Sequence, residues 1–259
     1  MSKAASAVPI LMYHSISDGP GPTCISTDIF RAQMQAIAES GATVIPLARF
    51  ADWRLKNASL PPRSVVITFD DGFLDFATNA FPVLEEFGFA SAVFIPTQTM
   101  ASPEGWVGAA SPARPLMDWA TVKFLSGRNV DFAPHSRTHA DLSQLSGEDL
   151  ENQIAASQAD LHERIGVCSR FFAPPYGRSN TEAMSVISRI FDLSFGVELG
   201  EARMTSPTHN IPRIEMHYYR DPAQLRSLLE GRGAGYLRMR KTLRAIRRLV
   251  SPGISTSYR

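Results

Sequence analysis

The chain has 259 residues, of which 44% are hydrophobic and 20% are charged, and its formal net charge is +1. This composition is ordinary for a globular protein, so it excludes a disordered, collagen-like or coiled-coil chain. The small net charge provides no overall field that would favour binding to a nucleic acid. The two cysteines, Cys24 and Cys168, are too few for a disulfide framework, and we expect both to be reduced and buried.

The N-terminal segment does not match a secretory signal peptide. Its apolar stretch extends only from Val8 to Tyr13, a length that fits a strand. Elsewhere no run approaches the roughly 18 apolar residues that a membrane-spanning helix needs. We therefore expect a cytoplasmic protein, with peripheral contact as the only membrane association to consider.

Short apolar runs alternate with helical patterns along the chain, which is typical of βα units around a mainly parallel sheet. Helices are expected near Thr27–Ser40 and Leu74–Phe87, and after Ser146, where Asp149 completes a capping box. The expected strands are Val8–Tyr13, Thr43–Ile45, Ser64–Phe69, Ala90–Ile95, Val130–Ala133, Arg170–Ala173, Leu193–Val197 and Ile211–Met216. An α/β barrel can use the whole chain, and barrels carry their chemistry at the carboxyl ends of the strands.

The first polar cluster, Thr68–Gly72, directly follows the continuous apolar run Ser64–Phe69. Asp70 and Asp71 are adjacent, so their carboxylates repel each other unless a metal ion binds or one carboxyl stays protonated. Gly72 allows the backbone to turn sharply after them. A helix N-cap followed by a turn would explain the same residues without any chemistry.

The second cluster contains His135 and His139, which follow the expected strand Val130–Ala133. Two imidazoles four residues apart lie on one side of a helical turn and can reach one cation, although two surface histidines would give the same pattern. Together with Asp71 they form a His₂Asp set, which leaves an open position for water as catalytic metal sites do. Imidazole and carboxylate ligands suit zinc, with other divalent metals as alternatives.

The third cluster is the segment Phe172–Gly177, which contains two prolines before Tyr176. The prolines fix an extended backbone, and the amide of Tyr176 could then stabilise an oxyanion. As a sequence, this segment could equally be any turn.

The order and spacing of Thr68–Gly72, His135–His139 and Ala173–Gly177 resemble the first three motifs of the polysaccharide deacetylase family. This is carbohydrate esterase family 4, with its NodB homology domain, and the resemblance extends from about Val8 to Arg220. It implies a distorted (β/α)₇ barrel. It also implies removal of acetyl groups from N-acetylglucosamine units or, in some members, from acetylated xylan.

The resemblance also implies a role for each matching residue. Asp70 becomes the general base, and Asp71, His135 and His139 become ligands of Zn²⁺ or of another divalent cation such as Co²⁺, Mn²⁺ or Ni²⁺. Tyr176 lies where the family places the oxyanion-stabilising backbone amide, and Pro175 and Tyr176 are expected to contact the substrate.

One departure from the family concerns the residue that orients the base. Many members have an arginine where this chain has Ala173. A subset supplies the arginine from a later strand, and Arg213 resembles that replacement. An ordinary surface arginine at the end of a strand would fit the sequence equally well.

The other departure concerns the general acid, because the usual late Leu-x-His motif is not evident. The opening Pro9–His14 segment resembles the branch that includes biofilm poly-N-acetylglucosamine deacetylases, whose acid histidine has moved to the first strand. We therefore assign His14 as the acid, with His217 as the alternative. A strand-end histidine that only satisfies the backbone would also fit position 14.

The resulting prediction is a metal-dependent hydrolase that removes N-acetyl groups from a glycan or glycolipid containing N-acetylhexosamine. Two other functions remain open at this point. The same site chemistry would serve an esterase that removes O-acetyl groups from xylan or a similar glycan. A carbohydrate-binding protein with an inactive site would also retain the fold.

We expect residues 1–230 to form the barrel domain and residues 231–259 to form a basic C-terminal helix and tail. Residues 231–250 contain seven basic residues and no acidic one, while Met239, Leu243, Ile246 and Val250 repeat at helical spacing. A basic amphipathic helix can lie on an anionic membrane surface. The alternative is a helix that packs on the barrel and turns a basic face to solvent.

Overall fold

The computed structural model describes the chain from residue 7 to residue 250, and side chains as far as residue 246. Seven strands pair in parallel in the order β8-β7-β6-β2-β12-β10-β9 and curve into a nearly closed barrel. Across the remaining gap, the backbone N–H of Ala173 donates to the carbonyl of Pro134 at 3.3 Å. The strands are β2 (Ile10–Tyr13), β6 (Ser64–Phe69), β7 (Ser91–Ile95), β8 (Val130–Pro134), β9 (Phe171–Phe172), β10 (Leu193–Leu199) and β12 (His209–Glu215). The predicted α/β barrel is therefore confirmed.

Short strands extend this barrel at its margins. β5 (Thr43–Val44) adds to the side of β6. β1 (Ala7–Val8) pairs with β11 (Ala202–Arg203), and β3 (Ser15–Ile16) pairs with β4 (Cys24–Ile25).

Strand β6 shows why the apolar runs become the barrel wall. Every one of its residues is buried, and alternate side chains belong to different apolar clusters. Val65 and Ile67 pack with the residues of the surrounding helices, whereas Val66 packs with residues contributed by other strands and by α2. Burial on both faces is the pattern of a parallel strand inside an α/β fold, and Asp70 follows directly at the carboxyl end of β6.

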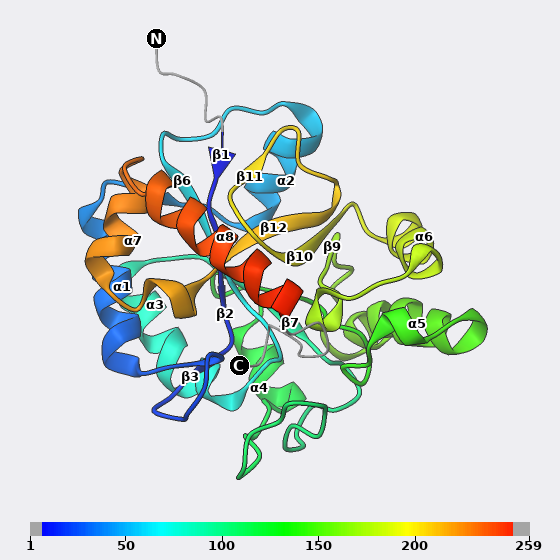
Figure 1. Cartoon of the computed structure of the whole chain (residues 1–259). Helices are drawn as coiled ribbons and strands as arrows, with labels where there is room; N and C mark the ends of the chain where they lie inside the picture. The colour runs from blue at the N-terminus through cyan, green and yellow to red at the C-terminus, as the bar shows by residue number, and fades with distance from the viewer. Residues whose placement is uncertain (1–6, 251–259) are drawn as a thin grey trace.

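Helices surround the barrel on its outer side (Figure 1). Their N-terminal caps follow local rules, as in α1, where the Ser26 hydroxyl accepts from the Ile29 amide. The helices are α1 (Thr27–Glu39), α2 (Leu47–Lys56), α3 (Phe81–Phe87), α4 (Trp119–Leu125), α5 (Gly147–Ile165), α6 (Thr181–Ile190), α7 (Pro222–Leu229) and α8 (Ala234–Val250). Within the described residues, none of these helices has the length and apolar character needed to cross a membrane.

Three local expectations differ from the structure. The helix expected at Leu74–Phe87 is divided into a π-helical turn, Phe76–Ala80, and α3, because Pro82 near the start of α3 has no N–H to continue the ladder. Ser146 precedes α5 but makes no side-chain capping bond. Cys24 is buried as expected, whereas Cys168 is exposed.

Two glycines have a left-handed backbone, but only one of them also lacks space for a side chain. Comparing them separates the cost of the backbone conformation from the cost of a steric clash. Gly177 has φ +62°, and a Cβ there would lie 2.4 Å from Val197 Cγ2, whereas Gly166 has φ +74° and open space around it. We expect Gly166→Ala to lower the free energy of unfolding by about 1 kcal/mol. Gly177→Ala should lower it by about 2–4 kcal/mol because Val197 must also move. Urea denaturation measures both losses, and equal values would contradict a steric contribution from Val197.

Candidate metal centre and active site

Three side chains far apart in the sequence converge at the carboxyl ends of β6 and β8. Asp71 follows β6, His135 follows β8 directly, and His139 lies in the next loop. All three are buried, and one ligand atom from each lies within 4.8 Å of the others. The Nε2 atoms of His135 and His139 are 3.4 and 3.1 Å from Asp71 Oδ1. The structure thus brings together the three residues for which the sequence predicted metal binding.

The two histidines do not lie on a helical turn, which corrects that part of the expectation. Residues 135–139 form an irregular loop in which Ser136 has φ 63° and His139 has φ 59°. Gln153 Oε1 of α5 holds the loop by accepting from the amides of Arg137 at 3.1 Å and Thr138 at 3.0 Å. Left-handed residues reverse the chain direction, so the second imidazole returns toward the first without helical geometry.

The chemistry of these donors fits a divalent metal ion. His135 Nδ1 donates to the Ala173 carbonyl at 2.6 Å, which leaves the lone pair of Nε2 on the side of Asp71. Both carboxylate oxygens of Asp71 are buried without a hydrogen bond of good geometry to any described residue. A buried carboxylate in that state requires a nearby positive charge, which a cation would supply.

The protonation states in this cluster agree with such a role. Burial opposes ionisation of Asp71, but the imidazoles of His139 and His135 beside it outweigh that effect, so the pKa of Asp71 lies well below its usual value. Burial also lowers the pKa of His139. An ionised carboxylate and a neutral imidazole are the forms that coordinate a metal.

Asp70 is held by a buried arginine rather than by the metal ligands. Arg213 of β12 donates to the two carboxylate oxygens of Asp70 at 2.7 and 2.6 Å, and its Nε donates to the Gly196 carbonyl at 2.9 Å. Arg213 is only 1% exposed, so it is not a surface arginine. Burial would raise the pKa of Asp70, but the Arg213 charge and hydrogen bonds outweigh it and lower that pKa.

His14 lies at the carboxyl end of β2 and is 6% exposed. Its charge acts on both Asp70 and Asp71, which places it beside the two carboxylates. His217, the alternative acid, lies in the short helical turn Met216–Tyr219, with its Nδ1 3.4 Å from Arg220 Nε. Because Tyr13 of β2 pairs with Phe69 of β6, the next residues, His14 and Asp70, lie side by side at the ends of these strands.

Glu215 is a half-buried carboxyl that was not among the site residues predicted from the sequence. It ends β12, and its Oε1 accepts from the His217 amide at 3.4 Å. Burial raises its pKa, and the nearby charge of His14 opposes the rise. Its only signal in the sequence was its position two residues before His217, the alternative acid.

The turn Pro175–Gly177 forms another side of the site. Tyr176 adopts φ 59°, and its ring contacts the His139 ring edge to face with centroids 4.7 Å apart. Its hydroxyl donates to the Val107 carbonyl at 3.4 Å. Burial raises the pKa of Tyr176 to about 12, so the phenol stays neutral at physiological pH. The Tyr176 side chain therefore contacts the metal cluster through His139, and the role of the Tyr176 amide stays a prediction.

The loop between β7 and α4 covers the cluster and was missed by the sequence analysis. The indole of Trp106 stacks on the His139 ring with centroids 4.2 Å apart. Buried Glu104 anchors the loop, since its Oε1 accepts from Arg114 Nε at 2.6 Å, and the Arg114 guanidinium lies 4.0 Å from the Phe73 ring centroid. A loop without periodicity gives no sequence signal for such contacts, apart from the presence of a tryptophan in a polar segment.

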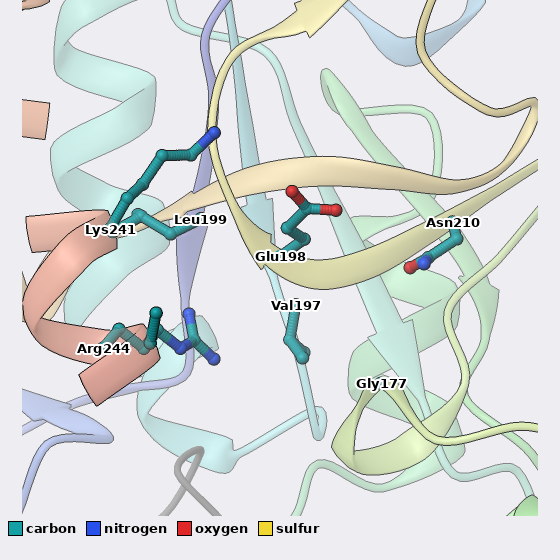
Figure 2. Close-up of a pocket in the computed structure, with 8 residues that line it drawn as sticks. Gly177, Val197, Glu198, Leu199, Asn210, Lys241 and Arg244 are labelled. Carbon is teal, nitrogen blue, oxygen red and sulfur yellow. The ribbon is translucent and has the colours of Figure 1, made fainter. Parts of the chain in front are cut away.

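A cavity of about 380 Å³ lies next to the Pro175–Gly177 turn (Figure 2). Strand β10 forms its floor, and α8 forms the side opposite Gly177. The charged or amide side chains that line it are those of Glu198, Asn210, Lys241 and Arg244. Lys241, Arg244 and Ala245 of α8 therefore lie across this cavity from the Pro175–Gly177 turn.

Comparison with known proteins agrees with these observations. Residues 57–190, just over half of the chain, match the family model described as polysaccharide deacetylase. The poly-beta-1,6-N-acetyl-D-glucosamine N-deacetylase of Staphylococcus aureus (strain MSSA476) is 26% identical over 204 residues, which cover 73% of this chain and 67% of that relative. The Escherichia coli (strain K12) protein of the same name is 24% identical over 241 residues, which cover 79% of this chain but 36% of that longer relative.

The fold is shared with a solved structure. IcaB from Ammonifex degensii superposes with a TM-score of 0.74 at 20% identity, covering 89% of this chain and 99% of that chain. This likeness confirms the expected barrel of the NodB homology type. From the family match and the shared barrel, the chain belongs to the polysaccharide deacetylase family.

Proposed function

We propose that the protein is a metal-dependent hydrolase that removes N-acetyl groups from a glycan containing N-acetylhexosamine. The main support for this proposal is that two features lie side by side at the end of β6: a cluster suited to bind a metal ion and a carboxylate suited to act as a base. Asp71, His135 and His139 form a ligand set, while the neighbouring Asp70 is ionised and bound to Arg213. The relatives named as poly-N-acetylglucosamine N-deacetylases support the substrate class.

The metal centre and the base have separate tasks in this proposal. Asp71, His135 and His139 would hold a divalent cation, which we propose is zinc, with cobalt, manganese or nickel as substitutes. When bound, this cation would provide the Lewis acidity that activates water and polarises the acetyl carbonyl. Asp70 accepts the proton of the attacking water. Arg213 fixes both oxygens of Asp70, so the base keeps one orientation throughout.

The remaining residues act on the charge that develops during the attack. The backbone N–H of Tyr176 is proposed to donate to the tetrahedral oxyanion, and Pro175 shapes the turn that presents it. His14 protonates the leaving amine, since an amide nitrogen cannot leave as an anion. Glu215, at the end of β12, is proposed to orient His14, because burial raises the pKa of Glu215 and the nearby charge of His14 opposes that rise.

Substrate assays separate this proposal from its rivals. We expect acetate release, detected by mass spectrometry, from N-acetylglucosamine oligosaccharides in a panel that also contains O-acetylated xylan fragments. A chelator should abolish release, and added zinc should restore it. Release from the xylan fragments alone would favour an O-acetyl esterase, and no release from any substrate by metal-loaded protein would favour a binding protein.

Asp70→Asn should abolish turnover while leaving metal content unchanged, because Asp70 is bound to Arg213 and is not one of the ligands. General-base catalysis typically contributes about 10²–10⁴-fold. Metal analysis by mass spectrometry and acetate release measure the two properties on one sample. His139→Ala is the matched control and should lose both. Wild-type turnover by Asp70→Asn would refute the assignment of the base.

His14→Ala should lower kcat by about 10²–10⁴-fold on an amide substrate. The loss should be smaller on an aryl acetate ester, whose leaving group needs no proton. His217→Ala is the comparison, and we expect it to stay within a few-fold of the wild type. A larger loss in His217→Ala than in His14→Ala would transfer the acid role to His217.

Arg213→Gln should raise the pKa of Asp70, because burial then acts without the opposing charge. With the arginine present, the folded-state pKa of Asp70 is depressed, so its stabilising effect is present above the unfolded pKa and is lost as pH falls through the folded pKa. The acidic limb of kcat/KM should therefore move to higher pH in Arg213→Gln.

Unfolding measurements provide the second readout for this ion pair. At neutral pH, Arg213→Gln should lower the free energy of unfolding by about 3–5 kcal/mol, since a buried carboxylate loses its partner. Asp70→Asn combined with Arg213→Gln should recover part of the loss. Equal stability of the single and double variants in urea would contradict the coupling.

A further inference from the structure

Helix α8 turns an apolar stripe outward rather than toward the barrel. Met239, Leu243 and Ile246 are 48%, 50% and 51% exposed. Spacings of four and three residues place them on one face of the helix. Among the large apolar side chains that the structure describes, the other exposed ones are scattered singly at Leu55, Val107 and Phe124. The α8 stripe is therefore a feature that packing of this domain does not explain.

Other side chains of α8 already hold the helix in place. The Tyr236 hydroxyl donates to the Tyr218 carbonyl at 2.6 Å, and the Arg240 guanidinium lies 4.1 Å from the Tyr218 ring centroid. Leu237 and Arg244 are buried, at 7% and 8% exposure. Figure 1 shows α8 outermost, in front of the barrel strands. The stripe is consequently available to a partner while the helix stays docked.

The charge around the stripe identifies the kind of partner. The segment 231–250 contains only basic charged residues, namely Arg232, Arg238, Arg240, Lys241, Arg244, Arg247 and Arg248. Because the net charge of the whole chain is +1, the remainder of the chain is net negative and positive charge is concentrated here. Arg238 is exposed beside the stripe, whereas Lys241, although exposed, lies on the side of the helix that lines the cavity near Gly177.

We propose that α8 binds flat on an anionic membrane surface. Met239, Leu243 and Ile246 would enter the boundary between headgroups and acyl chains, and Arg238 beside them would contact lipid phosphates. A second copy of the chain is a poorer partner, because a two-fold interface would place the same basic face against itself. A nucleic acid would use the cations but not the apolar stripe.

This orientation also bears on the substrate. Lys241 and Arg244 line the cavity that reaches Gly177, so the membrane-facing helix is next to the site. Resting on the proposed function, this arrangement suits a glycan that is attached to, or emerging from, a membrane. Membrane binding itself does not depend on catalysis and is tested separately.

Flotation of the full chain with phosphatidylcholine vesicles, with and without phosphatidylglycerol, tests the proposal. We expect binding only to the vesicles that contain phosphatidylglycerol, and weaker binding at high salt. The combined variant Met239→Gln, Leu243→Gln, Ile246→Gln should reduce the partition coefficient at least about tenfold. Phe124→Gln, which removes an equally exposed apolar side chain from α4, should bind like the wild type.

Two further readouts distinguish membrane binding from misfolding and from self-association. Circular dichroism and acetate release from a short water-soluble oligosaccharide should be unchanged in the triple variant, since the three side chains lie outside the site. Absence of flotation by the wild type, or equal flotation by the triple variant, would overturn the proposal. A dimer in sedimentation analysis that the triple variant converts to a monomer would overturn it in favour of self-association.

Discussion

Two adjacent carboxylates at the end of a buried strand are the constraint on which the site depends. Asp70 and Asp71 are 3% and 0% exposed, and neither can remain ionised there without nearby positive charge. A different group lies beside each of the two carboxylates. Arg213 compensates Asp70 through two hydrogen bonds, and the side of Asp71 is occupied by two imidazoles arranged as metal ligands. In the proposed function, Asp70 would act as a base while its neighbour Asp71 would hold a cation.

These groups come from different strands, so the barrel is what makes their arrangement feasible. Arg213 lies on β12, while His135 follows β8, and the two strands lie on opposite sides of β6 in the strand order. Curvature of the sheet brings both to the end of β6, with Asp70 and Asp71 between them. Closure of the barrel also brings the Ala173 carbonyl close to His135. This carbonyl accepts a hydrogen bond from His135 Nδ1 and so fixes the tautomer of His135. Ala173 thus contributes through its backbone, where many members of the family have an arginine side chain.

The sequence predicted the parts of this arrangement that depend on local pattern. The run Ser64–Phe69 became a fully buried strand, and the polar clusters lie at strand ends as expected. The helical turn expected at His135–His139 was wrong, because left-handed residues and Gln153 set the loop instead. The contacts of Trp106 and Glu215 depend on tertiary structure, which periodicity along the chain does not encode. Periodicity did predict the stripe of α8, but not that it faces outward. The division of the chain at residue 230 stays a prediction.

The left-handed backbone at Asp71, His139 and Tyr176 has a consequence for how this protein can change. That conformation costs free energy in residues other than glycine. Here Asp71 and His139 are proposed metal ligands, and Tyr176 is the proposed oxyanion donor. Replacements that relax the backbone at such positions would favour folding and oppose function. Selection for heat tolerance, in nature or in the laboratory, should therefore favour stabilising substitutions in the surrounding helices. The loops at the carboxyl ends of the strands, which carry the proposed site, should remain the least stable part of the barrel.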